Sequence, residues 1–530
     1  MTSRRWSLTG PAGGALVAVA VVVCAVGLGL GVAGGPLWLD EALSVEIAGR
    51  RAGSGLVDAL RQDGAPPLYY LLLSAWTAAL GTGTVAVRLL TVLLVPLALW
   101  LAWRLGRRLG GTAGGRAAVV VLAALPWTMR YGSETRMYLL VVVLVLAGSL
   151  ALLAVRRTPS RRAVAALAGC VGALLLTHYW ALFLLAVVGM WHLPGLLRRD
   201  AAAVRVVVAL VLGGMLFAPW LPVFVFQVQH TGAPWADPAG LLDLVRTPTF
   251  WGGGPRVGRV WLALLLVPLL VVAAVRRRSG RLLAGVVVAT LVLAFTAAAG
   301  GSGAYTGRYT AVVVPLVAVA AGLGALALPH AVGTAWLAVL VFVGATTGLP
   351  AVAQPRTSAG EVAGVFRSAA SPGDVLLYCP DQLGPPVARE IGPGYDQVVY
   401  PTLAGPELVD WVDYAERHDA AVPAEVARRV SSLAGDRSLF VLKASGYRTL
   451  EADDGSSDAG DDCDALLDAV ADLRGPGEHL FGELGTTGQL LFSFPPAGMG
   501  GDGRATARRP SREAGPSDER ATTWRRQPAR

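Results

Sequence analysis

Residues 11–42 read PAGGALVAVAVVVCAVGLGLGVAGGPLWLDEA, an apolar run that ends abruptly in two adjacent carboxylates. The apolar part is long enough to cross a bilayer as one helix, because a hydrocarbon core of roughly 30 Å needs about 20 helical residues. A signal peptide would have a shorter apolar run and a small-residue cleavage site, so we expect this segment to be retained. The chain is therefore predicted to begin with a membrane span.

Similar apolar runs recur from about residue 12 to about residue 349, and the composition then becomes ordinary. The 530 residues are 54% hydrophobic and only 15% charged, which is more apolar surface than one soluble core can bury. These observations predict an α-helical polytopic membrane protein with a polar domain at its C-terminal end.

Most arginines occur in short clusters between the apolar runs, near residues 4–5, 104–116, 156–162, 198–205 and 276–281. Such clusters are typical of cytoplasmic loops under the positive-inside rule. The net charge of +9 is thus explained by topology, and nucleic-acid binding is not supported.

If every arginine cluster is cytoplasmic, the chain needs about eleven spans. They are expected at about 12–34, 89–103, 113–129, 138–155, 163–177, 179–195, 202–219, 260–275, 282–299, 309–328 and 332–349. A further crossing by the apolar segment Pro67–Leu80 would place the later arginine clusters on the opposite side of the membrane. This segment is also short and has aromatic residues at its start. We expect it to be a re-entrant or surface-lying helix at the outer interface.

The predicted domains are a membrane domain at 1–350, an extracytoplasmic domain at 351–497 and a disordered tail at 498–530. Strand-like runs alternate with helical segments between about 358 and 495, which predicts a small α/β domain. The tail is rich in Gly, Arg, Ser and Pro. Cys379 and Cys463 lie in the α/β domain, where an extracytoplasmic location would permit a disulfide.

The first outer loop carries the adjacent carboxylates Asp40 and Glu41. Acids beside a hydrocarbon core are costly and usually have a function. As neighbours on a helix they cannot share one face, so at most one of them is expected to point into a site. Both residues also fit a simple alternative, a charged helix start that favours the positive end of the helix dipole.

The third outer loop contains Glu134, Arg136 and Tyr138. Glu134 and Tyr138 are four residues apart and can share a helix face. An arginine kept on the outer side against the usual bias favours an anionic ligand, although an interfacial ion pair with a tyrosine anchor is the alternative.

Two further outer positions carry polar side chains beside aromatic ones. Arg308 and Tyr309 lie at the mouth of a later span, where a phosphate at the membrane surface would find a suitable partner. His178 lies at a predicted hairpin tip, and a lone histidine there is either a ligand-binding group or an interfacial hydrogen-bonding residue.

Taken in order, these loops resemble the GT-C superfamily of membrane glycosyltransferases. The similarity is to the bacterial relatives of protein O-mannosyltransferases (family 39-like) and to lipid A aminoarabinose transferases, and it covers about residues 12–350. It rests on the order and spacing of six short motifs: Trp38-Leu39-Asp40-Glu41-Ala42, Pro66-Pro67-Leu68-Tyr69-Tyr70, Arg88-Leu89, Glu134-Thr135-Arg136-Met137-Tyr138, Thr177-His178-Tyr179 and Arg308-Tyr309.

The resemblance implies transfer of a sugar, with inversion, from a polyprenyl-phosphate donor to an extracytoplasmic acceptor. It implies catalytic carboxylates at Asp40 and Glu41, with Asp40 as general base, because an acceptor hydroxyl needs a carboxylate within hydrogen-bond reach. A leaving lipid phosphate needs positive charge, which assigns donor-phosphate binding to Arg136, Arg308 and Tyr309. The expected substrate-binding residues are Tyr69, Glu134, Tyr138 and His178.

Several features stay open at this stage. Members of the superfamily differ in their use of a divalent cation, and no tight metal-ligand spacing occurs here, so a metal is neither required nor assigned. The arginine-rich, nearly lysine-free composition is typical of high-GC bacteria and favours a mannose-like or arabinose-like sugar. The expected partners are the polyprenyl-phosphate sugar, membrane lipid and an unidentified acceptor glycan, lipid or protein.

Two rival functions remain. A transporter or flippase for a lipid-linked sugar would also need many spans and an outward polar cavity, and a non-catalytic scaffold could keep the same fold. We expect a multi-pass protein of the cell membrane, with its active site and C-terminal domain extracytoplasmic.

Overall fold

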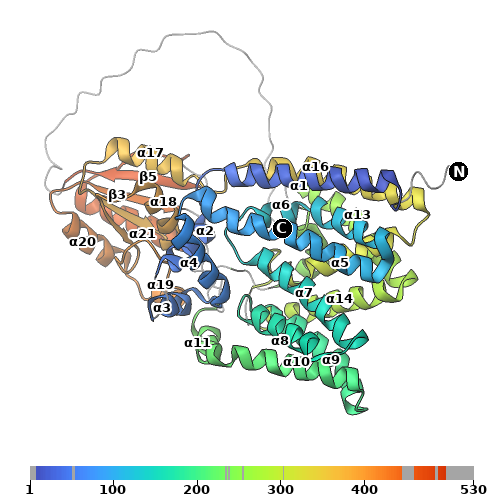
Figure 1. Ribbon diagram of the computed structural model, residues 1–530. Helices are drawn as coiled ribbons and strands as arrows, with labels where there is room; N and C mark the ends of the chain where they lie inside the picture. The colour runs from blue at the N-terminus through green and yellow to red at the C-terminus, as the bar shows by residue number, and fades with distance from the viewer. Residues whose placement is uncertain are drawn as a thin grey trace, which may run out of the picture.

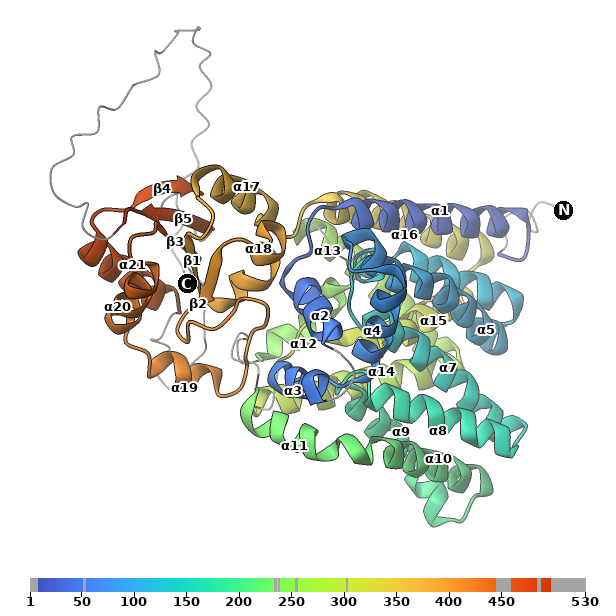
Figure 2. The ribbon, with the colours of Figure 1, turned by 60° about the vertical axis from the view of Figure 1, so that its left-hand side comes forward.

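The computed structural model describes residues 8–50, 54–232, 236, 239–252, 256–301, 304–444, 459–483 and 488–496. The predicted tail at 498–530 lies outside the described residues. A helical bundle makes up most of the molecule, and an α/β domain sits against one end of it (Figure 1). The first helix starts at the opposite end of the bundle, and a view from another side shows the same arrangement (Figure 2).

Ten helices form the bundle, and their bounds follow the predicted apolar runs. They are α1 (Pro11–Ala33), α5 (Thr84–Ala124), α7 (Tyr138–Arg157), α8 (Arg161–Leu175), α9 (Ala181–Leu197), α10 (Ala201–Phe217), α13 (Arg256–Arg276), α14 (Arg278–Ala299), α15 (Val314–Ala325) and α16 (His330–Ala353). Among the described residues, seven helices are long and apolar enough to cross a membrane. The protein is therefore a polytopic membrane protein, as predicted.

Helix α5 spans two of the predicted crossings, because the chain reverses inside it at Gly110 and Gly111. Gly111 has φ +69°, a left-handed conformation that favours glycine. The two halves then pack closely, since a Cβ on Gly106 would lie 2.4 Å from the carbonyl oxygen of Gly114. Small residues let the backbones approach, as is usual for helices in membranes. The predicted boundary at residue 129 was too late, because the helix ends at Ala124.

Short helices gather at the end of the bundle that faces the α/β domain (Figure 2). They are α2 (Leu39–Gly49), α3 (Ser54–Asp63), α4 (Leu68–Leu80), α6 (Pro126–Gly132), α11 (Leu221–His230), α12 (Leu241–Phe250) and the 3₁₀ turn η2 (Tyr309–Val312). Helix α4 is the segment predicted to lie at the interface. It packs on α2 and α5 and leaves Leu71, Leu72 and Leu80 exposed, which suits a helix at a membrane surface.

The α/β domain contains a five-stranded sheet of order β2-β1-β3-β5-β4. Strands β1 (Val375–Cys379), β2 (Asp396–Val399) and β3 (Leu439–Ala444) are parallel. Strands β5 (Gln489–Phe494) and β4 (Glu478–Phe481) continue the sheet in antiparallel fashion. Sequence patterning predicted four of these strands and missed β4, which has no buried residue.

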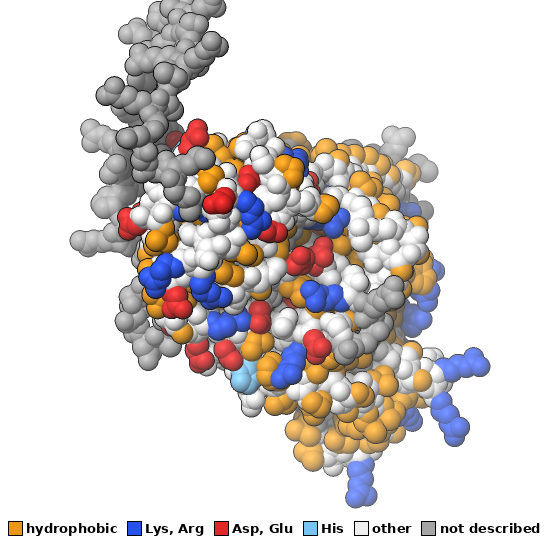
Figure 3. Space-filling model, turned by 90° about the vertical axis from the view of Figure 1, so that its left-hand side faces the viewer, with side chains coloured by type: hydrophobic (Ala, Val, Ile, Leu, Met, Phe, Trp, Pro, Cys, Tyr) orange, Lys and Arg blue, Asp and Glu red, His pale blue; other side chains and the backbone are white. Residues whose placement is uncertain are grey.

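Helices cover both faces of this sheet. One face packs on α17 (Ala359–Ala369) and α18 (Gly384–Ile391), and the other on α20 (Pro423–Ala434) and α21 (Ala459–Arg474). Along β1, Leu376 and Tyr378 face the first pair of helices while Val375 and Leu377 face the second, as the period of two in a strand requires. Acidic and basic side chains are mixed over the outer face of this domain (Figure 3).

A disulfide joins Cys379, at the end of β1, to Cys463 on α21, with 5.6 Å between the Cα atoms. This is the pair that the sequence left open. The bond ties a central strand to a helix on one face of the sheet, across 84 residues of chain.

Polar contacts attach the α/β domain to the bundle. Arg356, just before α17, pairs with Glu134 at 2.5 Å. In the loop before α19 (Tyr414–Asp419), the backbone N–H of Trp411 donates to the Gln62 carbonyl oxygen at 3.1 Å. The Asp413 N–H donates to the carbonyl oxygen of His230 at 2.7 Å, and their side chains also pair at 3.0 Å. These contacts hold the domain against the short helices at that end of the bundle.

Candidate functional site

A cavity of about 440 Å³ lies where the bundle meets the α/β domain. Its walls come from α2, the loop before α7, the α8–α9 hairpin, the loop before η2, helix α11 and the loop before α19. This volume falls within the range of about 300–1,000 Å³ that is typical of ligand pockets. Five of the nine residues predicted from sequence line it: Asp40, Arg136, His178, Arg308 and Tyr309.

Of the two adjacent carboxylates in α2, the Asp40 side chain lines this cavity and that of Glu41 does not. Asp40 lies in the first turn of α2, where the helix dipole favours negative charge. Arg308 Nη1 donates to Asp40 Oδ2 at 2.8 Å, and Arg136 Nε lies 3.9 Å from the same oxygen. Two guanidinium groups therefore meet one carboxylate at the cavity wall.

Arg136 is held by a polar network behind Asp40. Its Nη1 donates to Ser44 Oγ at 2.9 Å, to the Asp40 carbonyl oxygen at 3.3 Å and to Tyr70 Oη at 3.4 Å. Tyr70 in turn donates to Asp63 Oδ2 at 3.1 Å. Burial raises the pKa of Asp63 to about 6 despite the nearby Arg136. The network fixes the guanidinium and adds a carboxyl that titrates near neutral pH.

Glu41 points away from the cavity and forms a buried ion pair. Arg88 donates to both of its oxygens, through Nε at 2.9 Å and Nη2 at 2.7 Å. The N–H of Thr135 donates to Glu41 Oε1 at 2.9 Å. Arg88 also donates to four backbone carbonyl oxygens between residues 31 and 36. The pair thus joins α1, α2, α5 and the loop before α7.

Glu134 lies behind the cavity wall as well, and not on it. Arg356 pairs with its Oε2, and Arg356 Nη2 also donates to the carbonyl oxygen of Arg130 at 3.2 Å. Burial raises the pKa of Glu134, and the charge of Arg356 opposes that shift. The residue therefore connects the outer loop of the bundle to the linker that enters the α/β domain.

His178 and Tyr309 form the aromatic side of the cavity, with ring centroids 4.9 Å apart at an interplanar angle of 67°. The Trp180 N–H donates to His178 Nδ1 at 3.1 Å, which places the proton of a neutral ring on Nε2. Burial, followed by the charges of Arg136 and Arg308, lowers the pKa of His178 to about 3. His178 is therefore a neutral hydrogen-bond donor at physiological pH.

The two remaining tyrosines support this wall from behind. Tyr138 packs against His178 with ring centroids 6.0 Å apart, and both Tyr138 and Tyr69 are fully buried. The Tyr69 hydroxyl lies 3.4 Å from Thr91 Oγ1. Neither of these residues lines the cavity.

The cavity is also lined by groups that the sequence did not identify as a set. Gln227 is anchored by its Nε2, which donates to the Leu60 carbonyl oxygen at 2.7 Å, and its Oε1 accepts from the Tyr179 hydroxyl. Trp411 comes from the α/β domain and reaches the cavity beside these residues. The wall therefore combines an amide with aromatic faces, a combination that suits polar rings with apolar faces.

Four residues of the site gained their roles only from the structure: Asp63, Arg88, Arg356 and Trp411. Arg88 carried a detectable signal, since an arginine beside a span is costly and needs a partner. Nothing local marked Arg356 or Trp411, because their partners lie more than 150 residues away in the chain. Among the described residues, no three His, Cys, Asp or Glu side chains come together to hold a metal ion.

The bundle, its pocket and the α/β domain at one end define a polytopic membrane protein whose fold is also found in solved structures. ArnT from Cupriavidus metallidurans bound to undecaprenyl phosphate is similar over 90% of this chain and 97% of its own, with a TM-score of 0.56 and 15% identity. The same enzyme in the apo state gives a TM-score of 0.57, also at 15% identity.

Arabinofuranosyltransferase AftD from Mycobacteria is similar over 90% of this chain and 40% of its own, with a TM-score of 0.50 and 13% identity. No protein-family model matches the chain. No curated protein matches it significantly in sequence. At these identities the likeness establishes the fold, and the function must be argued from the site.

Proposed function

We propose that this protein is a membrane glycosyltransferase that moves a sugar from a polyprenyl-phosphate donor to an acceptor hydroxyl. The observation that carries the proposal is the group formed by Asp40, Arg136 and Arg308 at the wall of the outer cavity. Glycosyl transfer needs a base for the acceptor and positive charge for the leaving phosphate, and this group supplies both within one hydrogen-bonded cluster.

Arg308 and Arg136 are proposed to bind the donor phosphate. A phosphate entering the cavity would meet two guanidinium groups that share one carboxylate, and guanidinium N–H groups form strong charge-assisted hydrogen bonds with phosphate oxygens. Once the phosphate engages Arg308, the Asp40 carboxylate is released from its 2.8 Å contact and can accept the proton of the acceptor hydroxyl. The donor thereby activates its own base.

His178 and Tyr309 complete this side of the proposed site. A neutral His178 can donate from Nε2 to a sugar hydroxyl or phosphate oxygen, and the adjoining Tyr309 ring offers an aromatic face. Donation by a neutral group adds no further charge beside the two arginines. We keep both residues as ligand-contacting groups.

Glu41, Glu134, Tyr69 and Tyr138 receive a different proposed role from the one the motif resemblance implied. Both oxygens of Glu41 are engaged by Arg88, and Glu134 is paired with Arg356, so neither side chain reaches the cavity. We propose that the two acids position the outer loops and that the two tyrosines support the aromatic wall.

The α/β domain is proposed to contribute to acceptor binding. It places Trp411 in the cavity wall, and sugars stack on aromatic faces. For this reason we propose residues 1–350 as the transferase domain and 351–497 as a domain that completes its acceptor side.

The site and the α/β domain are proposed to be extracytoplasmic in the cell membrane. Two observations support this orientation: the arginine clusters near 104–116, 156–162, 198–205 and 276–281 lie at helix turns away from the α/β domain (Figure 1), and the α/β domain carries a disulfide. The solved structures suggest a donor class as well, since ArnT binds undecaprenyl phosphate and AftD is an arabinofuranosyltransferase. A mannose-like or arabinose-like sugar, transferred with inversion, fits this setting.

The test is transfer from radiolabelled polyprenyl-phosphate mannose and polyprenyl-phosphate arabinose in membranes that contain wild-type protein or Asp40→Asn. We expect one donor to label an acceptor with the wild type and the label to be lost with Asp40→Asn. Binding of polyprenyl phosphate should persist in the variant, because the arginines remain. Equal labelling by both proteins would remove Asp40 as the base.

A transporter or flippase would give a different result. It would move lipid-linked sugar across vesicles without labelling an acceptor, and Asp40→Asn would leave that movement nearly unchanged. A scaffold would give neither labelling nor movement with any donor.

A further inference from the structure

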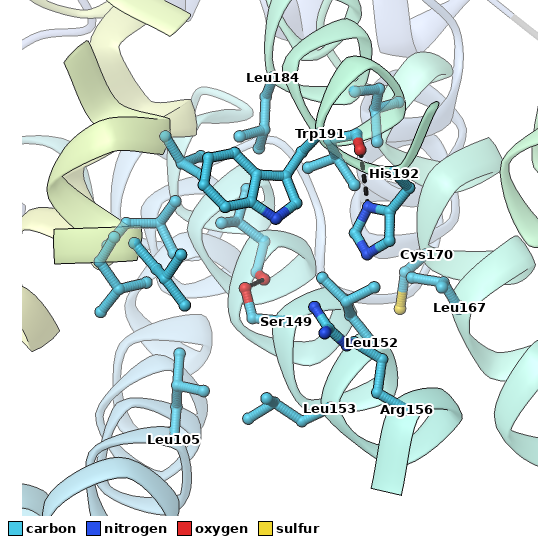
Figure 4. A pocket seen from close by; sticks show the side chains of 18 of the residues that line it. Leu105, Ser149, Leu152, Leu153, Arg156, Leu167, Cys170, Leu184, Trp191 and His192 are labelled. Carbon is cyan, nitrogen blue, oxygen red and sulfur yellow. Dashed lines mark hydrogen bonds between the residues drawn. The ribbon is translucent and has the colours of Figure 1, made fainter. Parts of the chain in front are cut away.

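A second cavity, of about 530 Å³, lies at the opposite end of the bundle from the Asp40 site. It is enclosed by α5, α7, α8, α9, α10, α14 and α15, and most of its lining is leucine and valine. Leu105, Leu152, Leu153 and Leu184 show this apolar lining in Figure 4. Nothing in the proposed transfer reaction uses this cavity.

Three arginines border the cavity: Arg156 and Arg157 at the end of α7, and Arg278 at the start of α14. All three side chains are exposed. In the part of the chain that the structure describes, no carboxylate pairs with any of them. A positive rim without acids beside an apolar interior is complementary to a molecule with an anionic head and a hydrocarbon tail.

His192 provides a second, independent feature of the same cavity. Its Nδ1 lies 2.8 Å from the Val188 carbonyl oxygen, so Nδ1 carries the proton and donates to that oxygen. Its Nε2 is buried and has no hydrogen-bond partner. In Figure 4 this second nitrogen is directed toward Cys170 and Arg156. A buried acceptor without a donor is costly, and a ligand hydroxyl would satisfy it.

We propose that this cavity is a binding site for an anionic glycerophospholipid from the leaflet on the arginine-rich face. An acyl chain occupies the apolar interior, the phosphate contacts Arg156, Arg157 and Arg278, and a headgroup hydroxyl donates to His192 Nε2. Trp191, half exposed at the same rim, lies where tryptophan is usual at a membrane interface. This site is separate from the proposed donor site, since the two cavities share no lining residue.

The test uses native mass spectrometry of the purified full chain titrated with three probes of equal acyl composition. They are phosphatidylglycerol (anionic, with headgroup hydroxyls), phosphatidic acid (anionic, without them) and phosphatidylcholine (zwitterionic). We expect phosphatidylglycerol to bind the wild type about 100-fold more tightly than phosphatidylcholine, given about 1 kcal/mol for each of the three arginines. Phosphatidic acid should fall between the two.

Variants separate this site from general surface charge. Arg156→Gln with Arg278→Gln should reduce the preference for phosphatidylglycerol about 30-fold, because two of the three arginines are removed. The control pair, Arg198→Gln with Arg199→Gln, removes the same charge from the same face without touching the cavity and should leave the preference intact. Equal losses in both pairs, or equal binding of all three lipids by the wild type, would overturn the proposal.

Two further variants test the interior. His192→Phe should lower the affinity for phosphatidylglycerol to that for phosphatidic acid, because it removes the acceptor and keeps the bulk. Ser149→Phe places a ring in the cavity and should weaken the binding of all three lipids to a similar degree. Thermal unfolding of each variant confirms folding, and wild-type lipid binding by a folded Ser149→Phe would rule out this cavity as the site.

Discussion

Arginine occupies both ends of the helical bundle, but the two ends use it differently. At the end facing the α/β domain, arginines meet carboxylates: Arg88 with Glu41, Arg136 and Arg308 with Asp40, and Arg356 with Glu134. At the other end, Arg156, Arg157 and Arg278 border an apolar cavity, and within the described residues they have no acidic partner.

The difference shows that an arginine can hold helices together, bind an anionic ligand or set the membrane topology. Arg88 is buried and hydrogen-bonded to Glu41 and to backbone carbonyl oxygens, so it holds neighbouring helices together. Arg308 shares its carboxylate with Arg136 at a cavity wall, where an anion would meet both guanidinium groups. Exposed arginines at the far end set topology and attract anionic lipid. The role of each arginine depends on how deeply it is buried and on how many carboxylates pair with it.

The largest expected effect comes from breaking the buried pair. Glu41→Gln removes the charge that Arg88 faces and should lower the free energy of unfolding by about 3–5 kcal/mol, the usual penalty for leaving a buried charge alone. Denaturant unfolding in detergent measures this change. Glu46→Gln on the same helix is the matched control, because Glu46 is partly exposed and should change stability by less than about 1 kcal/mol. Equal losses of unfolding free energy in both variants would contradict a structural role for the Arg88–Glu41 pair.

Next in size is the loss of an anion-binding arginine. Arg308→Gln removes the donor that faces Asp40 and, in the proposed reaction, the leaving phosphate. We expect transfer to slow by about 10²–10³-fold, the range seen when one preorganised donor to a developing charge is removed. Initial rates with labelled donor measure the change. Arg198→Gln, at the opposite end and outside both cavities, should leave the rate unchanged, and a similar loss in both variants would contradict the assignment.

A smaller effect concerns pH. The pKa of Asp63 is raised to about 6 by burial, so between about pH 4 and pH 6 the folded protein keeps a proton that the unfolded chain has lost. Asp63 therefore makes the protein less stable as pH rises through this window, with no further change above it. Asp63→Asn removes that slope. The melting temperature of Asp63→Asn minus that of the wild type should be higher at pH 7.5 than at pH 4.5.

Asp58→Asn provides the control for this pH series, because Asp58 is exposed on the same helix. It should shift the melting temperature equally at both pH values. A flat difference for Asp63→Asn as well would show that Asp63 does not titrate in the folded protein over this window.

Much of the fold followed from periodic apolar runs and arginine placement, because hydrocarbon imposes length and polarity on every crossing. The α5 hairpin was predicted in kind, although its end was placed five residues late. Strand β4 was missed because an edge strand with no buried residue lacks the apolar pattern that identifies strands.

The candidate site was predictable in part. The rule that helical neighbours cannot share a face anticipated that Asp40 and Glu41 would diverge, and the structure sends one to the cavity and the other to Arg88. Which acid goes where depends on Arg88, 47 residues away, and local spacing cannot show that. Trp411 was out of reach for the same reason, since its place depends on how the α/β domain docks.

The smallest expected effect tests that docking contribution. Trp411→Ala removes an aromatic side chain from the cavity wall. Stacking of this kind is worth about 0.5–1.5 kcal/mol, so the KM for acceptor should rise about fivefold while kcat and the KM for donor stay constant. Trp100→Ala, which removes a half-exposed tryptophan outside both cavities, should change none of these constants. A fall in kcat with an unchanged acceptor KM would instead place Trp411 in the arrangement of the catalytic loops, so that the α/β domain would act on the chemistry and not on acceptor affinity.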